Sequence, residues 1–271
     1  MALITSRQNP EVKLYTSLLK KKYRDKMGLI PLEGVRLIRE ALSCGIEFTS
    51  VLYSEELLKG LKGRELLQSI SIGNPGVKTV YIAKGLLRET ADTENPQGIL
   101  AVVKKPDYNL SQISETEKPL VMVISGLQDP GNLGSMIRTA SAACVSGVIV
   151  SRGTVDIFNP KTLRGTMGAI FHLPVIVIKD AMSIINYLRH CNIKIVVTDL
   201  EAEANCFQGD LTGPTAVVFG SEAFGVSDEF KVEADLRLKI PLLGAAESLN
   251  VSVSAGIIIY EAVRQRHFSS F

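Results

Sequence analysis

The sequence predicts an α/β protein in two parts, an inference that rests on three observations. Short apolar runs with the length of strands alternate with segments of helical period along most of the chain. In the later part these runs are continuously apolar, as they are in a parallel sheet that is covered on both faces. A polar segment at 105–118, with no apolar period, is predicted to link a first domain at 1–104 to a second at 119–271.

The first domain is predicted to be a small α/β domain. Helices are expected at 10–26, 35–45 and 55–68, and strands at 28–34, 48–54, 77–83 and 98–105. The second of these helices ends at Gly45, a residue type that readily takes the left-handed conformation at a helix end.

The second domain alternates more regularly than the first. Strands are expected at 119–125, 147–152, 173–178, 193–200, 215–221 and 236–243. Helices are expected at 132–144, 160–170, 180–190, 226–233 and 248–266. The pattern predicts a sheet with helices on both faces.

Composition limits the class of protein. Apolar residues make up 46% of the chain and charged residues 21%, as in a globular protein with a sizeable core. The net charge is only +2, so nucleic-acid binding would need a local basic patch. No apolar run reaches the roughly 18 residues of a membrane-spanning helix, and the first residues lack the apolar core of a signal peptide. We therefore expect a cytoplasmic protein with no membrane segment.

The cysteines show no metal-binding spacing. Cys44, Cys144, Cys191 and Cys206 form no CxxC pair, and the three histidines lie far from them in the sequence. We expect no metal site and interpret the cysteines as small apolar residues in a reducing compartment. No motif supports a cysteine nucleophile paired with a histidine.

The first polar motif, GLQDPGNLGSMIRTASA at 126–142, follows a predicted strand. On a helix that begins at Asn132, the apolar side chains share one face and Arg138 lies on the border of the polar face. Asn132 is a candidate N-cap, and Gly131 and Gly134 would let a ligand or another chain approach the start of the helix. The alternative is an ordinary capped helix whose arginine makes a surface ion pair.

A second motif, VVFGSEAFGV at 217–226, places a Gly-Ser-Glu turn directly after another predicted strand. Open α/β sheets bind ligands beyond the carboxyl ends of their strands, where Gly220 and Gly225 would expose backbone groups. Glu222 would anchor this loop or pair with a cation. The alternative is a surface turn with a solvated glutamate.

A third motif, IPLLGAAESLNVSVSAGIIIY at 240–260, runs from a strand end through a loop into an apolar helix that should be buried. Ser248, Ser252 and Ala255 form a stripe of small residues that permits close approach of another element or subunit. Asn250 is either a local cap or a group directed toward a ligand. The GxGxxG and GxxxxGK[ST] spacings of nucleotide sites are absent from all three motifs.

In this order, the three motifs resemble those of the SpoU/TrmH family of RNA ribose 2′-O-methyltransferases. The matching stretches are DPGNLGSMIRTA at 129–140, VVFGSEAFGVS at 217–227 and IPLLGAAESLNVSVSAGIIIYEA at 240–262. The stretch GTMGAIFHLPV at 165–175 is also similar. Ser221 stands where many members have asparagine, which affects only the details of that loop.

The resemblance implies a C-terminal trefoil-knotted SPOUT domain that binds S-adenosylmethionine in the knot and works as a homodimer. Knots are so rare that general rules of chain topology would not predict one. The first domain is similar to the ribosomal-protein-like substrate-binding domain of some members. The stretches that carry this similarity are SRQNPEVK at 6–13 and LEGVRLIREAL at 32–42. That similarity implies an N-terminal RNA-binding domain.

The resemblance also implies roles for single residues. Arg138 would lie at the 2′-hydroxyl of the target ribose, supported by Asn132 and positioned by Glu222. The third motif would complete the catalytic set with Ser248 and Asn250. The residues implied to hold the cofactor are Thr198, Gly220, Ile240, Leu242 and Leu249.

Methyl transfer requires a hydroxyl aligned behind the methyl group, exclusion of water and removal of a proton. The sulfonium already activates the methyl group, so no metal is needed. Arginine is a poor base because its ordinary pKa lies above about 12. Arg138 would either lose its proton in an unusual site or stay charged, hold an RNA phosphate and stabilise the ionised hydroxyl. We favour the charged role.

A basic cluster in the first domain is the candidate RNA contact. The first forty residues contain nine Lys and Arg against four Asp and Glu, a net charge of +5. The residues we expect to contact RNA phosphates are Lys20, Lys21, Lys22 and Arg24. The alternative is a solvated helix face.

The predicted function is S-adenosylmethionine-dependent RNA 2′-O-ribose methylation, with 23S rRNA favoured because of the first domain. One alternative is a tRNA 2′-O-methyltransferase, and another is a non-catalytic RNA-binding or ribosome-assembly protein. The intact set of motif residues argues against a pure binder. Methylation at a drug site of the ribosome would use the same chemistry on another nucleotide.

Overall fold

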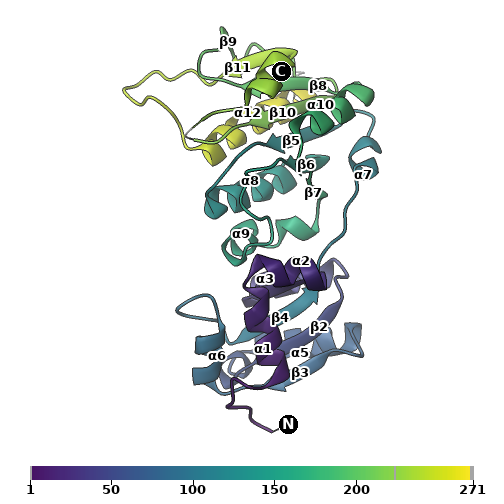
Figure 1. Ribbon diagram of the computed structural model, residues 1–271, viewed down its shortest axis with the longest axis vertical. Helices are drawn as coiled ribbons and strands as arrows, with labels where there is room; N and C mark the ends of the chain where they lie inside the picture. Colours follow the sequence, from purple (N-terminus) through teal and green to yellow (C-terminus); the bar gives the residue numbers. More distant parts are fainter. Residues whose placement is uncertain (1, 223, 269–271) are drawn as a thin grey trace. The chain divides into compact units, whose positions relative to one another are not determined.

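The structure is a computed structural model that describes residues 2–222 and 224–268 (Figure 1). It divides into two compact units. The first unit combines the chain up to Asp107 with the segment Asp156–Phe171, and the second combines Tyr108–Val155 with the chain from His172 onward. The domain boundaries at 104 and 119 stay a prediction. The segment Asp156–Phe171, by contrast, packs with the first unit although it follows the first motif in the sequence.

The first unit is built on a four-stranded mixed sheet in the order β1-β4-β2-β3. Its strands are β1 (Leu29–Glu33), β2 (Phe48–Tyr53), β3 (Lys78–Tyr81) and β4 (Ile99–Lys104). β4 pairs antiparallel with β1 and β2, and β2 pairs parallel with β3. All four strands lie where the sequence predicts them, because each is a short apolar run between turn residues.

The helices of this unit are α1 (Pro10–Leu18), α2 (Lys21–Met27), α3 (Val35–Ser43), α4 (Glu55–Leu58), α5 (Leu61–Gly73), α6 (Lys84–Thr90), α9 (Pro160–Thr166) and the short 3₁₀ helix η1 (Ala169–Phe171). The predicted helix at 10–26 is two helices. The chain breaks after Leu18 because the buried guanidinium of Arg24 donates to the carbonyls of Leu18 and Leu19, which a continuous helix would use itself. The predicted helix at 55–68 is also divided, at Lys59 and Gly60.

The second unit contains a seven-stranded sheet in the order β7-β6-β5-β10-β8-β11-β9. Its strands are β5 (Leu120–Ile124), β6 (Gly147–Val150), β7 (Val175–Val177), β8 (Lys194–Thr198), β9 (Ala204–Asn205), β10 (Thr215–Phe219) and β11 (Leu236–Lys239). Every pairing in this sheet is parallel, as the sequence predicts. All residues of β5 and β10 are buried, which explains their uniformly apolar sequences.

Helices cover both faces of this sheet (Figure 1). The helices of the unit are α7 (Ser111–Ser114), α8 (Pro130–Ala142), α10 (Ala181–His190), α11 (Asp228–Val232) and α12 (Val251–His267). One core cluster joins α7, α10 and α11 to β5, β8 and β10. On the other side, α8 and α12 pack against each other. No helix within 2–222 and 224–268 is both long and apolar enough to cross a membrane.

The strand order brings two of the motifs together. The chain runs outward from β5 to β7 and then returns to the other side of β5, where β10 pairs with it. Ile124 and Phe219, the last residues of β5 and β10, are directly opposite each other. The first and second motifs therefore leave neighbouring strands at the carboxyl edge, where open parallel sheets bind ligands.

Candidate active site

The loops beyond this carboxyl edge enclose a cavity of about 380 Å³ in the second unit. Its walls come from the ends of β8, β10 and β11 and from the start of α12. All five residues predicted to bind the cofactor line it: Thr198, Gly220, Ile240, Leu242 and Leu249. Apolar side chains and the backbone of a glycine thus line one slot, which suits a flat heterocycle.

Gly220 cannot carry a side chain in this loop. A Cβ at this position would collide with the backbone of Gly225. Two backbone hydrogen bonds close the loop. Ser221 N donates to Gly225 O at 3.0 Å, and Gly225 N donates to Ser221 O at 2.9 Å. Gly225 has a φ of +67°, which strongly favours glycine. Both glycines of the second motif are therefore required by the geometry of the cavity wall.

Three predicted catalytic residues from three motifs meet at this edge. The side-chain amide of Asn132 donates to Glu222 Oε1 at 2.9 Å. The amide of Asn250 donates to Asn132 Oδ1 at 3.0 Å and to Glu222 Oε1 at 3.3 Å. The three positions are 28 to 118 residues apart in sequence, so the tertiary fold alone brings them together.

Helix caps orient two of these side chains. Asp129, not Asn132, is the N-cap of α8, because its Oδ1 accepts from Asn132 N at 2.7 Å. This corrects the predicted cap and leaves the Asn132 side chain to contact Glu222. Asn250 is the N-cap of α12, and its Oδ1 accepts from Ser252 N at 2.9 Å while its amide reaches Asn132. The interpretation of Asn250 as a local cap is thus confirmed, and its role toward a ligand stays a prediction.

The other two predicted catalytic residues are less tightly placed. Ser248 is exposed and lines the cavity, two residues before the Asn250 cap, so it does not belong to the helix as the sequence predicts. Arg138 lies in α8 with an exposed side chain. Within the described residues, no hydrogen bond or ion pair joins Arg138 to Asn132, Glu222 or Asn250.

The cavity also has charged walls that the sequence analysis did not predict. Asp199 and Lys231 line it. Burial alone raises the pKa of Asp199, but hydrogen bonds from the backbone of Glu201 and from Arg237 outweigh burial and hold that pKa below its ordinary value. The available signal was the position of Asp199 directly after a strand of the sheet.

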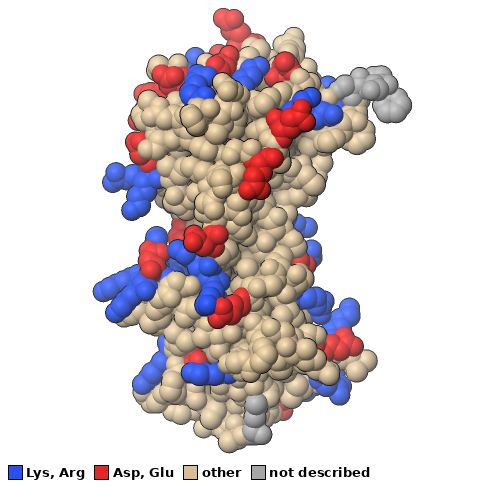
Figure 2. All heavy atoms as spheres, turned by 90° about the vertical axis from the view of Figure 1, so that its right-hand side faces the viewer, with Lys and Arg blue, Asp and Glu red and all other residues tan. Residues whose placement is uncertain are grey.

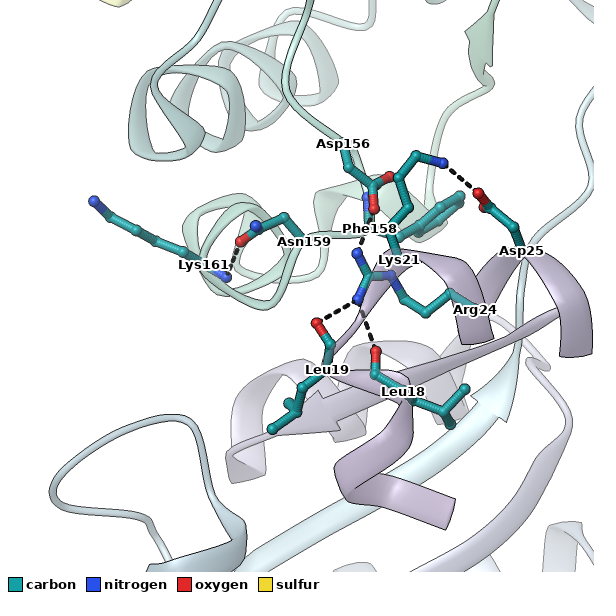
Figure 3. Close-up of polar contacts among 9 residues, drawn as sticks. All are labelled: Leu18, Leu19, Lys21, Arg24, Asp25, Asp156, Phe158, Asn159 and Lys161. Atoms are coloured by element: carbon teal, nitrogen blue, oxygen red, sulfur yellow. Dashed lines mark hydrogen bonds and ion pairs between the residues drawn. The ribbon is translucent and has the colours of Figure 1, made fainter. Parts of the chain in front are cut away.

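The basic cluster of the first unit is only partly exposed. Lys20, Lys21 and Lys22 are exposed, and Lys21 pairs with Asp25 at 2.5 Å. Arg24 is only 3% exposed, and its Nη2 lies 2.5 Å from Asp156 Oδ2 (Figure 3). Its guanidinium is therefore not accessible to an RNA phosphate, which corrects the grouping of Arg24 with the surface lysines. Charges of both signs are interspersed over the face in Figure 2, in keeping with the low net charge.

Comparison with known proteins identifies the family. Residues 119–260, more than half of the chain, match the model of the SpoU rRNA Methylase family. The chain belongs to this family. Residues 9–101 match the MRM3-like substrate binding domain. The resemblance inferred from the three motifs, and the second domain type inferred from the first part, are both confirmed.

Relatives of known structure or function match this SpoU-family chain over nearly its whole length. The 23S rRNA (guanosine(2553)-2′-O)-methyltransferase RlmP of Bacillus subtilis is 34% identical over 260 residues, which cover 96% of this chain and 98% of the relative. The SpoU methyltransferase AviRb of Streptomyces viridochromogenes, in complex with AdoMet, superposes with a TM-score of 0.85 at 30% identity, covering 95% and 98% of the two chains. An AdoMet-bound rRNA methyltransferase from Sinorhizobium meliloti gives a TM-score of 0.86 at 28% identity, with coverage of 97% and 98%.

Proposed function

We propose that this chain transfers the methyl group of S-adenosylmethionine to the ribose 2′-hydroxyl of a nucleotide in 23S rRNA. One observation carries the proposal above the others. Asn132, Glu222 and Asn250, from three separate motifs, form one hydrogen-bonded group beside the cavity that all five predicted cofactor residues line. The 23S rRNA substrate named for the Bacillus subtilis relative supports the choice of RNA.

The residues of the cavity fit the cofactor. Ile240, Leu242 and Leu249 provide an apolar slot, and Gly220 lines it beside them where the backbone of Gly225 packs too closely for a side chain. When bound, S-adenosylmethionine supplies a methyl group that is activated by the positive sulfonium. The task of the protein is to orient the acceptor hydroxyl, exclude water and remove a proton.

The side-chain group at the cavity edge holds its members in fixed orientations. Glu222 Oε1 accepts from both amides, and this shared acceptor favours one orientation of each amide. This arrangement suits the alignment of a ribose. We assign to the exposed Arg138 the role of a permanent cation that holds an RNA phosphate and stabilises the ionised hydroxyl.

Three further features belong to the proposal. The chain would thread as a trefoil knot around the cavity, act as a homodimer and work in the cytoplasm without a metal. The exposed apolar residues of α12, Val253 and Tyr260, support the homodimer. Exposed Lys20, Lys21 and Lys22 would contact RNA phosphates, and their exposure supports this assignment.

The test is transfer of labelled methyl groups from S-adenosylmethionine to purified 23S rRNA, 16S rRNA and tRNA, followed by digestion to nucleosides. We expect a 2′-O-methylated nucleoside from 23S rRNA alone. Arg138→Ala should reduce the rate by about a hundredfold or more, because a charged donor near the reacting oxygen is lost. Arg64→Ala removes an exposed arginine of α5, remote in sequence from all three motifs, and serves as the matched control.

Other outcomes would point to the rival functions. Methylation of tRNA alone would favour the tRNA enzyme. Intact cofactor binding without transfer to any of the RNAs, or to assembling large-subunit particles, would favour the non-catalytic RNA-binding or assembly protein.

A further inference from the structure

A second cavity, of about 490 Å³, lies in the first unit. It is formed by the start of α3, the loop between α6 and β4, and the end of α9. The start of α3 and the loop between α6 and β4 lie within residues 9–101, which match the substrate-binding domain. α9 lies within residues 119–260, which match the methylase family. Both matched regions of the chain therefore contribute walls to this cavity.

Several contacts within the first unit fix the segment that carries α9. Asp156 pairs with the buried Arg24, and the ammonium of Lys105 lies 5.8 Å from the ring centroid of Phe158. Asn159 caps α9 by accepting from Lys161 N at 2.9 Å (Figure 3). The helix is thus held at both its start and the preceding loop.

From this helix, Arg164 reaches the loop between α6 and β4. Its Nη2 lies 2.8 Å from Asp92 Oδ2. Its Nη1 lies 3.9 Å from Glu33 Oε2. This Nη1 is buried and has no hydrogen-bond partner among the described residues. Glu33 is already occupied, because it accepts from Asp92 N at 2.9 Å and from the hydroxyl of Thr93. The lining of the cavity therefore includes a guanidinium whose charge is balanced by two carboxylates but whose Nη1 has no hydrogen-bond partner among the described residues.

One end of the cavity suits an anion. Arg36 and Leu37 lie in the first turn of α3, where backbone N–H groups have no partner inside the helix. The Val35 N–H is already taken by Gln97 Oε1 at 2.9 Å. The exposed side chain of Arg36 adds a positive charge to the lining. Arg164, whose charge is balanced by Asp92 and Glu33, adds the N–H groups of its Nη1, which have no hydrogen-bond partner among the described residues.

The remainder of the cavity suits a base. Leu37 and Met167 provide apolar surface, and the exposed Glu94 and Asn95 offer an acceptor and a mixed donor–acceptor group in the lining. Proteins recognise RNA sequence mainly through unpaired bases that are held on such surfaces and read at their edges. The volume lies within the range of about 300–1,000 Å³ that is usual for small-molecule sites.

We propose that this cavity binds one unpaired nucleotide of the RNA substrate, with its phosphate between Arg36 and Arg164 and its base edge at Glu94 and Asn95. The inference rests on the proposed function, since it assigns part of the RNA to a site in the first unit. It makes Arg164, which lies outside residues 9–101 that match the substrate-binding domain, a residue that holds the phosphate and positions the nucleotide.

The experiment compares Arg36→Ala with Arg39→Ala, two exposed arginines of α3 of which only Arg36 lines the cavity. We expect Arg36→Ala to raise both the Kd for 23S rRNA fragments and the KM for methyl transfer about tenfold, with kcat unchanged. The slope of log Kd against log salt should fall by about 0.7 to 0.9. Arg39→Ala should change each quantity less. Arg164→Gln, which removes the charge but retains hydrogen-bond donors, should behave like Arg36→Ala.

Equal effects of Arg36→Ala and Arg39→Ala on an active enzyme would overturn the cavity assignment alone. Fragment binding that depends on Arg36, with no methyl transfer by the unchanged chain, would overturn the proposed function but not the RNA contact. A last experiment measures whether adenosine monophosphate or guanosine monophosphate competes with the 23S rRNA fragments for binding. Arg36→Ala could weaken binding of a mononucleotide and leave the affinity for RNA unchanged. That result would assign the cavity to a free nucleotide and overturn our inference.

Discussion

At the scale of single residues, one amide side chain performs two tasks. Asn250 uses its oxygen to cap α12 and its nitrogen to contact Asn132 and Glu222. An aspartate would keep the cap but lose the donor, and a serine could not span both partners. The sequence suggested the cap as one of two alternatives for Asn250, and the structure shows that the capping residue also joins the first and second motifs.

Asp199 provides a prediction at the same scale. Its pKa is held below the ordinary value of about 3.9, so the folded protein binds fewer protons here than the unfolded chain. Its contribution to stability is therefore complete above about pH 4 and is lost as the pH falls through the lowered pKa. Asp199→Asn should reduce the free energy of unfolding by about 1 to 2 kcal/mol at neutral pH. Urea titrations should show that this difference shrinks near pH 3, and an equal difference at both pH values would contradict the assignment.

At the scale of elements, tertiary contacts decide where helices end. The apolar period at 10–26 favours one helix, but Arg24 takes the carbonyls at the end of α1 and forces a second helix to start at Lys21. Local periodicity cannot predict this break because the guanidinium that contacts these carbonyls is held by Asp156, which is 132 residues away in the sequence.

The segment predicted as a linker contains the short helix α7, whose Ile113 is fully buried in the core of the second unit. Its side chain packs so closely on β6 that a Cβ at Gly147 would lie 2.6 Å from Ile113 Cγ1. Ile113→Ala should therefore lower the free energy of unfolding by about 2 to 5 kcal/mol. Ile72→Ala, at a side chain that is 71% exposed, should cost less than about 0.5 kcal/mol. Urea denaturation of both variants tests this, and similar midpoints would show that α7 does not stabilise the unit.

At the scale of the whole molecule, we propose that the interface of the predicted homodimer includes α12. Val253 and Tyr260, seven residues apart on one helical face, are 50% and 49% exposed, although the sequence predicts a buried helix. A large exposed aromatic side chain on such a face is typical of an interface. Tyr260→Glu should weaken the dimer by about 2 kcal/mol or more, because a charge would be buried at the contact.

Sedimentation velocity measures this change directly. The unchanged chain should sediment as a dimer at concentrations where Tyr260→Glu is a monomer. Tyr23→Glu, at an exposed tyrosine of α2, is the matched control and should remain dimeric. A monomeric unchanged chain, or an unaffected Tyr260→Glu dimer, would refute the interface.

The sequence by itself determined the α/β class and the parallel sheet, and its three motifs identified the family and, through that resemblance, five residues that line the cavity of the second unit. It could do so because strands buried on both faces must be apolar throughout, and because Gly220 and its neighbouring turn residues are required by local backbone geometry. Only the tertiary structure decided that Asn132, Glu222 and Asn250 touch, that Arg24 is buried and that Arg164 belongs to a cavity of the first unit. These contacts join residues far apart in the chain, and no local pattern encodes a pairing that arises only when distant elements pack together.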